Sequence, residues 1–326
     1  MKHIYLYFLI GIIGFFQFSC TEKEESELDR QKATDDKLIA DFIAENNIDT
    51  EKDENGIYYQ VMKSNPGGET INLEDIVEIY YRISTLDGRV IEAKLAENSQ
   101  PKKFRHTSGG LYPVGINIGV GYMNVGEKYK FFIPSHLALE SYGNSILARN
   151  SVLIAEVEVV NILTDQEQLE LEYDSIINYI NNSGSTNTIQ YNDNGLVKEV
   201  LQLGNGKAPT SNSLVSIGLE RKYLDGTNTK LPRDNGSGES LIDLNYVTCG
   251  DEITTCASTG LKLGILSMKE GEKAQILVPS YLAFDSYTQV FPEKFRSEFL
   301  TSHLKYQDLI PFAIIIYEID LIEVGY

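Results

Sequence analysis

The feature that most constrains this chain is a cassette that occurs twice. Residues 123–139 read MNVGEKYKFFIPSHLAL, and residues 268–284 read MKEGEKAQILVPSYLAF, and the two copies align without a gap. Upstream of each copy, a glycine that opens a predicted strand and an Asp-Gly turn recur in the same order. A repeat of this length in a chain of 326 residues predicts two domains of similar architecture.

Each repeat begins with a predicted helix and continues as predicted strands. Residues 35–46 and 171–182 carry apolar residues at three- and four-residue spacing, which is typical of an amphipathic helix. Runs rich in β-branched and aromatic residues follow, and they predict strands. These runs are residues 57–62, 76–83, 128–133 and 152–162 in the first half, and 196–203, 214–219, 241–244, 273–278 and 311–324 in the second. Short helices are expected within 113–123 and after Gly260.

Each cassette resembles a segment of the FKBP-type peptidyl-prolyl isomerases. That segment runs from a short pocket helix, through Met-x-x-Gly-Glu, into a strand that ends Ile/Val-Pro-x-x-Leu-Ala. The resemblance implies an α+β fold with two FKBP-like domains, each an antiparallel sheet wrapped on a short helix and preceded by a helical segment. We expect domain 1 at 35–164 and domain 2 at 165–326. The second would carry a helical insertion at 285–309, beside the pocket.

The chemistry that this resemblance implies needs no nucleophile and no cofactor. Rotation about an Xaa-Pro bond faces a barrier of about 18–20 kcal/mol, because amide resonance must be lost. A site that binds the twisted amide better than the planar one lowers this barrier. The expected partners are therefore proline-containing polypeptides or envelope proteins.

Carrying the family's aromatic pocket onto domain 1 gives a partial match. Glu92 stands where the family has Asp, Ile116 replaces a Trp, and Ala155 replaces a Phe. The loop residue is either Leu139 or Tyr142. The resulting candidate pocket is Tyr81, Glu92, Phe104, Ile116, Leu139 and Tyr142. Replacing a buried Trp by Ile removes apolar contact worth about 2 kcal/mol, so activity is expected to be weak. Tyr81 and Phe104 could instead be plain core residues.

In domain 2 the matching positions keep two aromatic residues. These two are Phe284 and Tyr317; Leu261 stands at the start of the helix, and the acidic position has become Lys230. A lysine inverts the local field that a carboxylate would supply. Any catalysis is therefore expected in domain 1.

The first twenty residues resemble a bacterial lipoprotein signal. The apolar run from Ile4 to Phe16 is too short to span a bilayer, and Ser19 precedes Cys20, which would become the acylated first residue. Gln17 departs from the usual pattern, and an ordinary cleavable signal or an uncleaved anchor is the alternative. Residues 21–34 are polar and acidic and predict a disordered tether. The chain would then lie in the cell envelope, lipid-anchored to the outer membrane and facing either the periplasm or the surface.

The two remaining cysteines, Cys249 and Cys256, predict a disulfide in an exported protein, with unpaired buried thiols as the alternative. A metal site is not expected, because the 4 histidines are scattered singly.

Charge limits the class of partner. Lysine and arginine total 28 against 47 acidic residues, a formal net charge of -19. A phosphate backbone requires a basic face, so nucleic acid is excluded as the expected partner. Three functions remain open: a folding helper similar to the FKBP-like lipoproteins associated with gliding motility, a non-catalytic tandem module that binds peptides or an envelope partner, and a surface protein for glycan or nutrient capture.

Overall fold

The computed structural model describes residues 26–193, 195–227, 229, 239–245 and 258–325. Cys20, Lys230, Cys249 and Cys256 lie outside this part of the chain, so the lipidation and disulfide predictions stay predictions. Within it, no helix is both long enough and apolar enough to cross a membrane.

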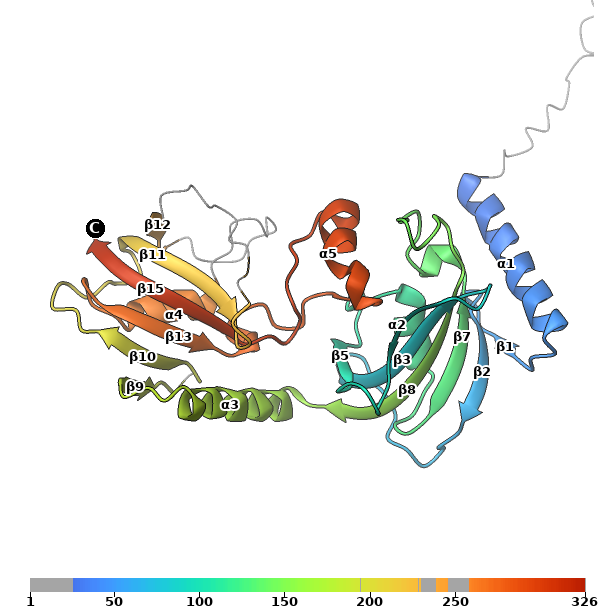
Figure 1. Ribbon diagram of the computed structural model, residues 1–326, viewed down its shortest axis with the longest axis horizontal. Coiled ribbons are helices and arrows are strands. Elements are labelled where there is room, and N and C mark those ends of the chain that lie inside the picture. The colour runs from blue at the N-terminus through green and yellow to red at the C-terminus, as the bar shows by residue number, and fades with distance from the viewer. Residues whose placement is uncertain (1–25, 194, 228, 230–238, 246–257, 326) are drawn as a thin grey trace, which may run out of the picture.

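Two antiparallel sheets follow one another along the chain (Figure 1). The first has the order β1-β2-β7-β8-β3-β4, with β5 also paired to β3. Its strands are β1 (Glu51–Lys52), β2 (Tyr58–Lys63), β3 (Ile76–Thr85), β4 (Val90–Lys94), β5 (Lys102–Arg105), β7 (Lys128–Ile133) and β8 (Leu153–Leu163). The helix α2 (Val114–Val120) lies in its concave side and contributes Ile116 and Val120 to the core.

The second sheet has the order β12-β11-β15-β13-β10-β9. Its strands are β9 (Thr188–Tyr191), β10 (Val197–Gln202), β11 (Leu214–Tyr223), β12 (Glu239–Asp243), β13 (Lys273–Val278) and β15 (Ile315–Val324). The helix α4 (Thr259–Leu266) packs on it through Leu261 and Ile265. The α+β class expected from the sequence is confirmed.

The repeated Gly-Glu turn has the same backbone geometry in both sheets. Gly126 and Gly271 have φ of 87° and 83°, in the left-handed region that favours glycine. Each is followed by a buried glutamate, Glu127 or Glu272, which accepts hydrogen bonds from backbone amides of the turn. The repeated sequence is therefore a folding signal.

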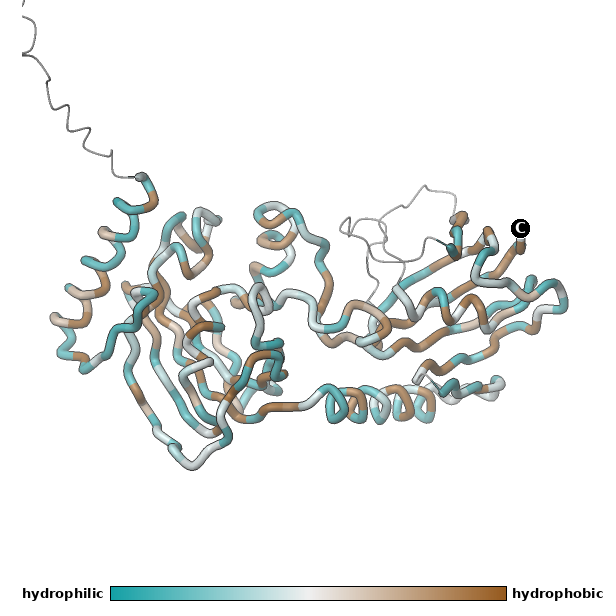
Figure 2. Tube along the Cα trace, turned by 180° about the vertical axis from the view of Figure 1, so that it is seen from behind, coloured by the Kyte–Doolittle hydropathy of each residue, from teal (hydrophilic) through white to brown (hydrophobic). Residues whose placement is uncertain are grey.

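A long helix precedes each sheet and fastens to it by the same contact. In α1 (Glu27–Glu45), the buried Asp35 accepts from the backbone N and the Oγ of Ser135, at 2.8 and 2.6 Å. In α3 (Asp165–Asn182), the buried Glu172 accepts from the backbone N and the Oγ of Ser280, both at 2.6 Å. Figure 2 shows both helices alternating between hydrophilic and hydrophobic residues, as helices with one buried face do.

Both helices are longer than the sequence pattern predicts. Helix α1 begins at Glu27, so residues 27–34, expected to be a disordered tether, are helical. Ser26 caps its N-terminus by accepting from the backbone N of Asp29, and the first turn is acidic. Helix α3 begins at Asp165 with a capping box formed by Thr164 and Glu167. These local signals extend each helix beyond its apolar stripe.

The insertion lies between β13 and β15 in sequence but packs on the first domain (Figure 1). Its strand β14 (Gln289–Val290) pairs in parallel with β6 (Leu111–Tyr112) of the first domain. One 3-10 turn, one short α-helix and one π-helical segment follow: η4 (Glu293–Phe295), α5 (Arg296–Glu298) and η5 (Phe299–Leu304). The peptide bonds Tyr112–Pro113 and Phe291–Pro292 are cis. The insertion of the second domain therefore lies beside the pocket of the first domain.

Candidate functional site

The structure brings the candidate residues of domain 1 together on the concave side of the first sheet. Five of them are buried in one hydrophobic cluster, and Glu92 lies half-buried next to Tyr81. The five are Tyr81 on β3, Phe104 on β5, Ile116 on α2, and Leu139 and Tyr142 in the loop after β7. Antiparallel pairing explains the approach of Tyr81 to Glu92, because β3 and β4 form a hairpin.

The insertion of the second domain occupies this site. Five of its apolar side chains belong to the same buried cluster: Val290, Phe291, Phe295, Phe299 and Leu300. The ring of Phe291 lies against that of Tyr81, with 4.2 Å between centroids. Pro292, the next residue, is also buried. A segment that contains a proline therefore packs on the candidate pocket residues, with Phe291 as the side chain that contacts Tyr81.

Glu92 binds the backbone that follows Pro292. Its Oε1 accepts from the Tyr81 hydroxyl at 2.5 Å and from the amide N of Glu293 at 2.6 Å. Its Oε2 accepts from the amide N of Lys294 at 3.4 Å. One carboxylate thus binds both the Tyr81 side chain of the pocket and the backbone that follows Pro292.

Tyr142 contacts the far end of the insertion. Its hydroxyl donates to Glu298 Oε2 at 2.8 Å and accepts from Asn144 Nδ2 at 2.9 Å. Its ring packs on Phe295 and Phe299, with centroids 5.8 and 5.4 Å away. Burial, and then the hydrogen bond to Glu298, raise the pKa of Tyr142 to about 12, so the hydroxyl keeps its proton at neutral pH.

Several residues of the site were not predicted from the sequence. Tyr112 packs its ring on Phe299, with 5.2 Å between centroids. Lys94 and Lys102 hold the carboxylate of Glu293. The aromatic and charged pattern of the insertion was visible in the sequence, but the pattern carried no information about which domain it contacts.

In domain 2, the three predicted residues also belong to one cluster. Leu261 and Tyr317 are buried, and the half-buried Phe284 packs against them. The Tyr317 hydroxyl shares a hydrogen bond of 2.8 Å with Ser258 Oγ, and the guanidinium of Arg221 lies 5.1 Å above the ring of Phe284. Burial raises the pKa of Tyr317.

The register of the sheets shows that the two cores carry their large ring on different strands. Phe131 pairs with Ala155 in the first sheet, whereas Ile276 pairs with Tyr317 in the second. The large ring lies on the inner strand in one domain and on the last strand in the other. In the first domain the ring of Phe131, on the neighbouring strand, therefore fills the space beside Ala155, where the family has an aromatic residue.

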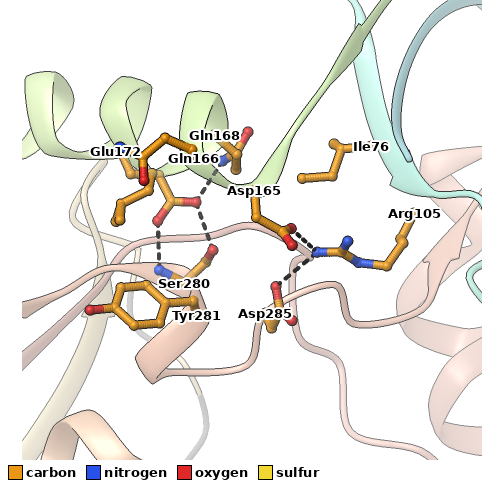
Figure 3. Close-up of a pocket in the computed structure, with 10 residues that line it drawn as sticks. Ile76, Arg105, Asp165, Gln166, Gln168, Glu172, Ser280, Tyr281 and Asp285 are labelled. Atoms are coloured by element: carbon orange, nitrogen blue, oxygen red, sulfur yellow. Dashed lines mark hydrogen bonds and ion pairs between the residues drawn. The ribbon is translucent and has the colours of Figure 1, made fainter. Parts of the chain in front are cut away.

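A second hollow, of about 280 Å³, lies at the joint between the domains (Figure 3). Arg105 of the first sheet reaches Asp165 Oδ1 at 2.8 Å and Asp285 Oδ1 at 3.5 Å, and Glu172 binds Ser280 on the other wall. Its charged groups pair with one another, as expected for a structural joint. Among the described residues, no cluster of three potential metal ligands occurs.

Comparison with known proteins points to one family. The family model for FKBP-type peptidyl-prolyl cis-trans isomerase matches residues 67–160. The chain is 29% identical over 153 residues to the FKBP-type peptidyl-prolyl cis-trans isomerase FkpA of Aeromonas hydrophila, across 46% of this chain and 55% of that protein. It therefore spans about half the length of that relative.

Two FK506-binding proteins are covered more fully. The chain is 36% identical over 98 residues to FK506-binding protein 2 of Yarrowia lipolytica, across 30% of this chain and 67% of that protein. It is 31% identical over 111 residues to FK506-binding protein 1A of Neurospora crassa, across 33% of this chain and 88% of that protein. With these likenesses and the matching family model, the chain belongs to the FKBP-type peptidyl-prolyl cis-trans isomerase family.

Proposed function

We propose that this chain is an envelope protein that binds proline-containing polypeptides in the pocket of its first domain and isomerises their prolyl bonds weakly, assisting the folding of exported proteins. One observation carries the proposal. On either side of Pro292 the chain contacts that pocket: the ring of Phe291 packs against Tyr81, and the amide N of Glu293 donates to Glu92. These contacts support a site that holds a prolyl peptide.

The proposed mechanism uses desolvation and positioning. The buried walls formed by Tyr81, Phe104 and Ile116 remove the prolyl amide from water, which weakens its resonance-stabilised planar form. Glu92 fixes the chain after proline. The Tyr142 hydroxyl is engaged by Glu298 in this structure, and once that contact opens it can donate to a rotated carbonyl. Ile116 offers a substrate less apolar contact area than the family's Trp would. Because buried apolar area contributes about 25 cal/mol per Å² to binding, this replacement favours low activity.

The alternative is a non-catalytic module that only binds peptides or an envelope partner. The filled pocket supports it, because a bound segment competes with any substrate. An assay of residues 21–326 on a refolding protein limited by a prolyl bond separates the two, since that bond turns over unaided in about 10–100 s.

The expected result is a modest acceleration that Tyr81→Ala abolishes. The matched change Tyr317→Leu, in the pocket of domain 2, leaves the acceleration in place. An acceleration that survives Tyr81→Ala, or depends on Tyr317, contradicts the site assignment. No acceleration by the wild type or by Phe291→Ala/Phe299→Ala, which removes two apolar side chains of the insertion from the pocket, rejects the catalytic function and leaves the binding alternative.

The envelope location rests on the proposed acylation of Cys20. The chain extracted from membranes is expected to begin at Cys20 and to carry added acyl mass, as read by intact mass spectrometry. The control is Cys20→Ser, which removes the acceptor thiol. A soluble product cut at another residue contradicts the anchor.

A further inference from the structure

The insertion contacts the first pocket with more specificity than apolar packing requires. Besides the aromatic contacts, its residues Gln289 to Phe291 bond to β6 in parallel register. The amide N of Gln289 donates to Gly110 O at 2.9 Å, and that of Phe291 donates to Tyr112 O at 2.8 Å. A peptide backbone is therefore aligned on the pocket before the proline and held by Glu92 after it.

Charge recognition is concentrated on the residue directly after the proline. Glu293 Oε2 lies 3.3 Å from Lys94 Nζ, and Oε1 lies 3.1 Å from Lys102 Nζ. The two lysines come from β4 and β5, which both pair with β3, the strand of Tyr81. All three side chains are only 28–29% exposed, so solvent screens these pairs less than it screens fully exposed ones.

The following residues add two further contacts. Lys294 Nζ donates to Ile91 O at 2.6 Å, and Glu298 accepts from Tyr142. The pocket thus binds an aromatic side chain before proline, a carboxylate directly after it and an ammonium group next. In a chain with a net charge of -19, a pair of lysines aimed at one carboxylate is a selective feature.

We infer that residues 287–304 are a tethered ligand of the first domain, and that the polypeptides that displace it carry an aromatic residue before proline and an acidic residue directly after it. This inference rests on the proposed function and adds its ligand class and its regulation. The tether competes at an effective concentration on the order of millimolar, as short linkers provide. External peptides therefore gain access only when they match the tether's contacts or when the tether is released.

The test uses residues 21–326 and a fluorescent peptide with the sequence of residues 287–304. Binding is measured by anisotropy to the wild type and to Phe291→Ala/Phe299→Ala, which removes two anchors of the tether. The matched control is Ser297→Ala, an exposed position of the same segment. We expect the released variant to bind the peptide at least ten-fold more tightly than the wild type and the control do. Equal affinities overturn the tether.

A second variant tests the ligand class without touching the buried anchors. Lys94→Glu/Lys102→Glu reverses the two charges that hold Glu293. We expect it to prefer a peptide with Glu293→Lys about ten-fold over the natural sequence, whereas Phe291→Ala/Phe299→Ala shows the opposite preference. A charge-reversed variant that binds the Glu293→Lys peptide no better than the natural sequence overturns the assignment of Lys94 and Lys102, and this outcome does not depend on the folding of the double alanine variant.

A reference peptide with alanine on both sides of its proline separates this inference from the proposed function. If the released variant binds or isomerises the reference peptide as well as the natural sequence, the ligand class is wrong and the proposed function stands. If it binds neither peptide, the proposed function fails as well.

Discussion

At the scale of single residues, Glu92 connects the wall of the first pocket to the segment that fills it. It accepts from the Tyr81 hydroxyl and from two successive backbone amides of the insertion. Burial of Tyr81 is the largest cause of its raised pKa, and the charge of Glu92 is the second, so the phenol stays protonated. A neutral donor and a charged acceptor form a strong hydrogen bond.

Glu92→Ala removes this acceptor, and the amide of Glu293 is expected to exchange its hydrogen at least ten-fold faster. Hydrogen bonds to a charged group contribute about 1.5–3 kcal/mol, and 1.36 kcal/mol is a factor of ten. Glu92→Gln keeps one acceptor oxygen, so the exchange rate of the Glu293 amide is expected to lie between those of the wild type and Glu92→Ala. Glu97→Ala, on an exposed position nearby, is the control. Unchanged protection in Glu92→Ala contradicts the role of the carboxylate.

Gly126 is required by its backbone conformation. Gly126→Ala places a side chain at φ of 87° and a Cβ 2.9 Å from Asn65 Nδ2, and it is expected to lower the free energy of unfolding by about 1–2 kcal/mol. Gly67 has open space around it and no positive φ, so Gly67→Ala should change stability by less than about 0.5 kcal/mol. Urea unfolding measures both. Equal effects would refute the account of the turn.

At the scale of elements, each long helix is fastened to its sheet by a buried carboxylate and a serine. The serine follows the proline at the end of β7 or β13, so the repeated Pro-Ser of the cassette is the receptor for the preceding helix. A glutamine one turn earlier, Gln31 or Gln168, donates to the same carboxylate in both domains.

Asp35→Ala leaves the backbone N and the hydroxyl of Ser135 without their acceptor. Each buried unsatisfied donor costs about 1–3 kcal/mol, so the first domain is expected to lose roughly 2–4 kcal/mol of stability. Asp41→Ala, on an exposed position of the same helix, should cost well under about 1 kcal/mol. Thermal unfolding compares the two variants, and similar melting temperatures would exclude the contact as a determinant of docking.

Glu172, on helix α3, makes the stability of the second domain depend on pH. Burial raises the pKa of Glu172 above 4.5, although its hydrogen bonds from Ser280 and Gln168 act in the opposite direction. A raised acid pKa means that the folded state holds a proton which the unfolded state has lost. Its contribution to stability is therefore complete below about pH 4.5 and is lost as the pH rises through the raised value.

Glu172→Gln has no such titration. The stability of the wild type relative to Glu172→Gln is expected to fall as the pH is raised from 4 to 7, as measured by urea unfolding of the second domain. Gln168→Glu is unsuitable as a control because it adds a charge beside Glu172, so Glu170→Gln, on an exposed position of the same helix, is used. A pH-independent difference would contradict the raised pKa.

Much of this architecture could be predicted from the sequence, and the reason is local. The Gly-Glu turn, the strand that follows it and the amphipathic stripes of α1 and α3 are determined by residues close together in the chain. The first residues of these helices were harder to predict, because the caps Ser26 and Thr164 lie outside the apolar stripes.

The contents of the first pocket could not be predicted in this way. Tyr81, Glu92 and Tyr142 were identified from the family pattern, but Phe291 and Glu293 reach them from the other half of the chain. Contacts at such separation depend on the orientation of both domains, which periodicity does not record.

At the scale of the whole molecule, the two domains are linked by three elements. Helix α3 connects the sheets, Arg105 pairs with Asp165 and Asp285 at the joint, and the insertion contacts the first pocket (Figures 1 and 3). The second domain therefore contributes side chains to the cluster that holds the candidate residues of the first. Its own cluster around Tyr317 is a conventional apolar core in the described residues.

The ring of Phe291, which comes from the second half of the chain, lies against Tyr81 in the pocket of the first domain. The most direct measurement is a nuclear Overhauser effect between the ring protons of Tyr81 and Phe291, in residues 21–326 with labelled tyrosine and phenylalanine. Tyr81→Phe and Phe291→Leu assign the two resonances. Ring centroids 4.2 Å apart predict a strong cross peak. Assigned resonances without a cross peak would show that the segment is elsewhere in solution and would contradict the account.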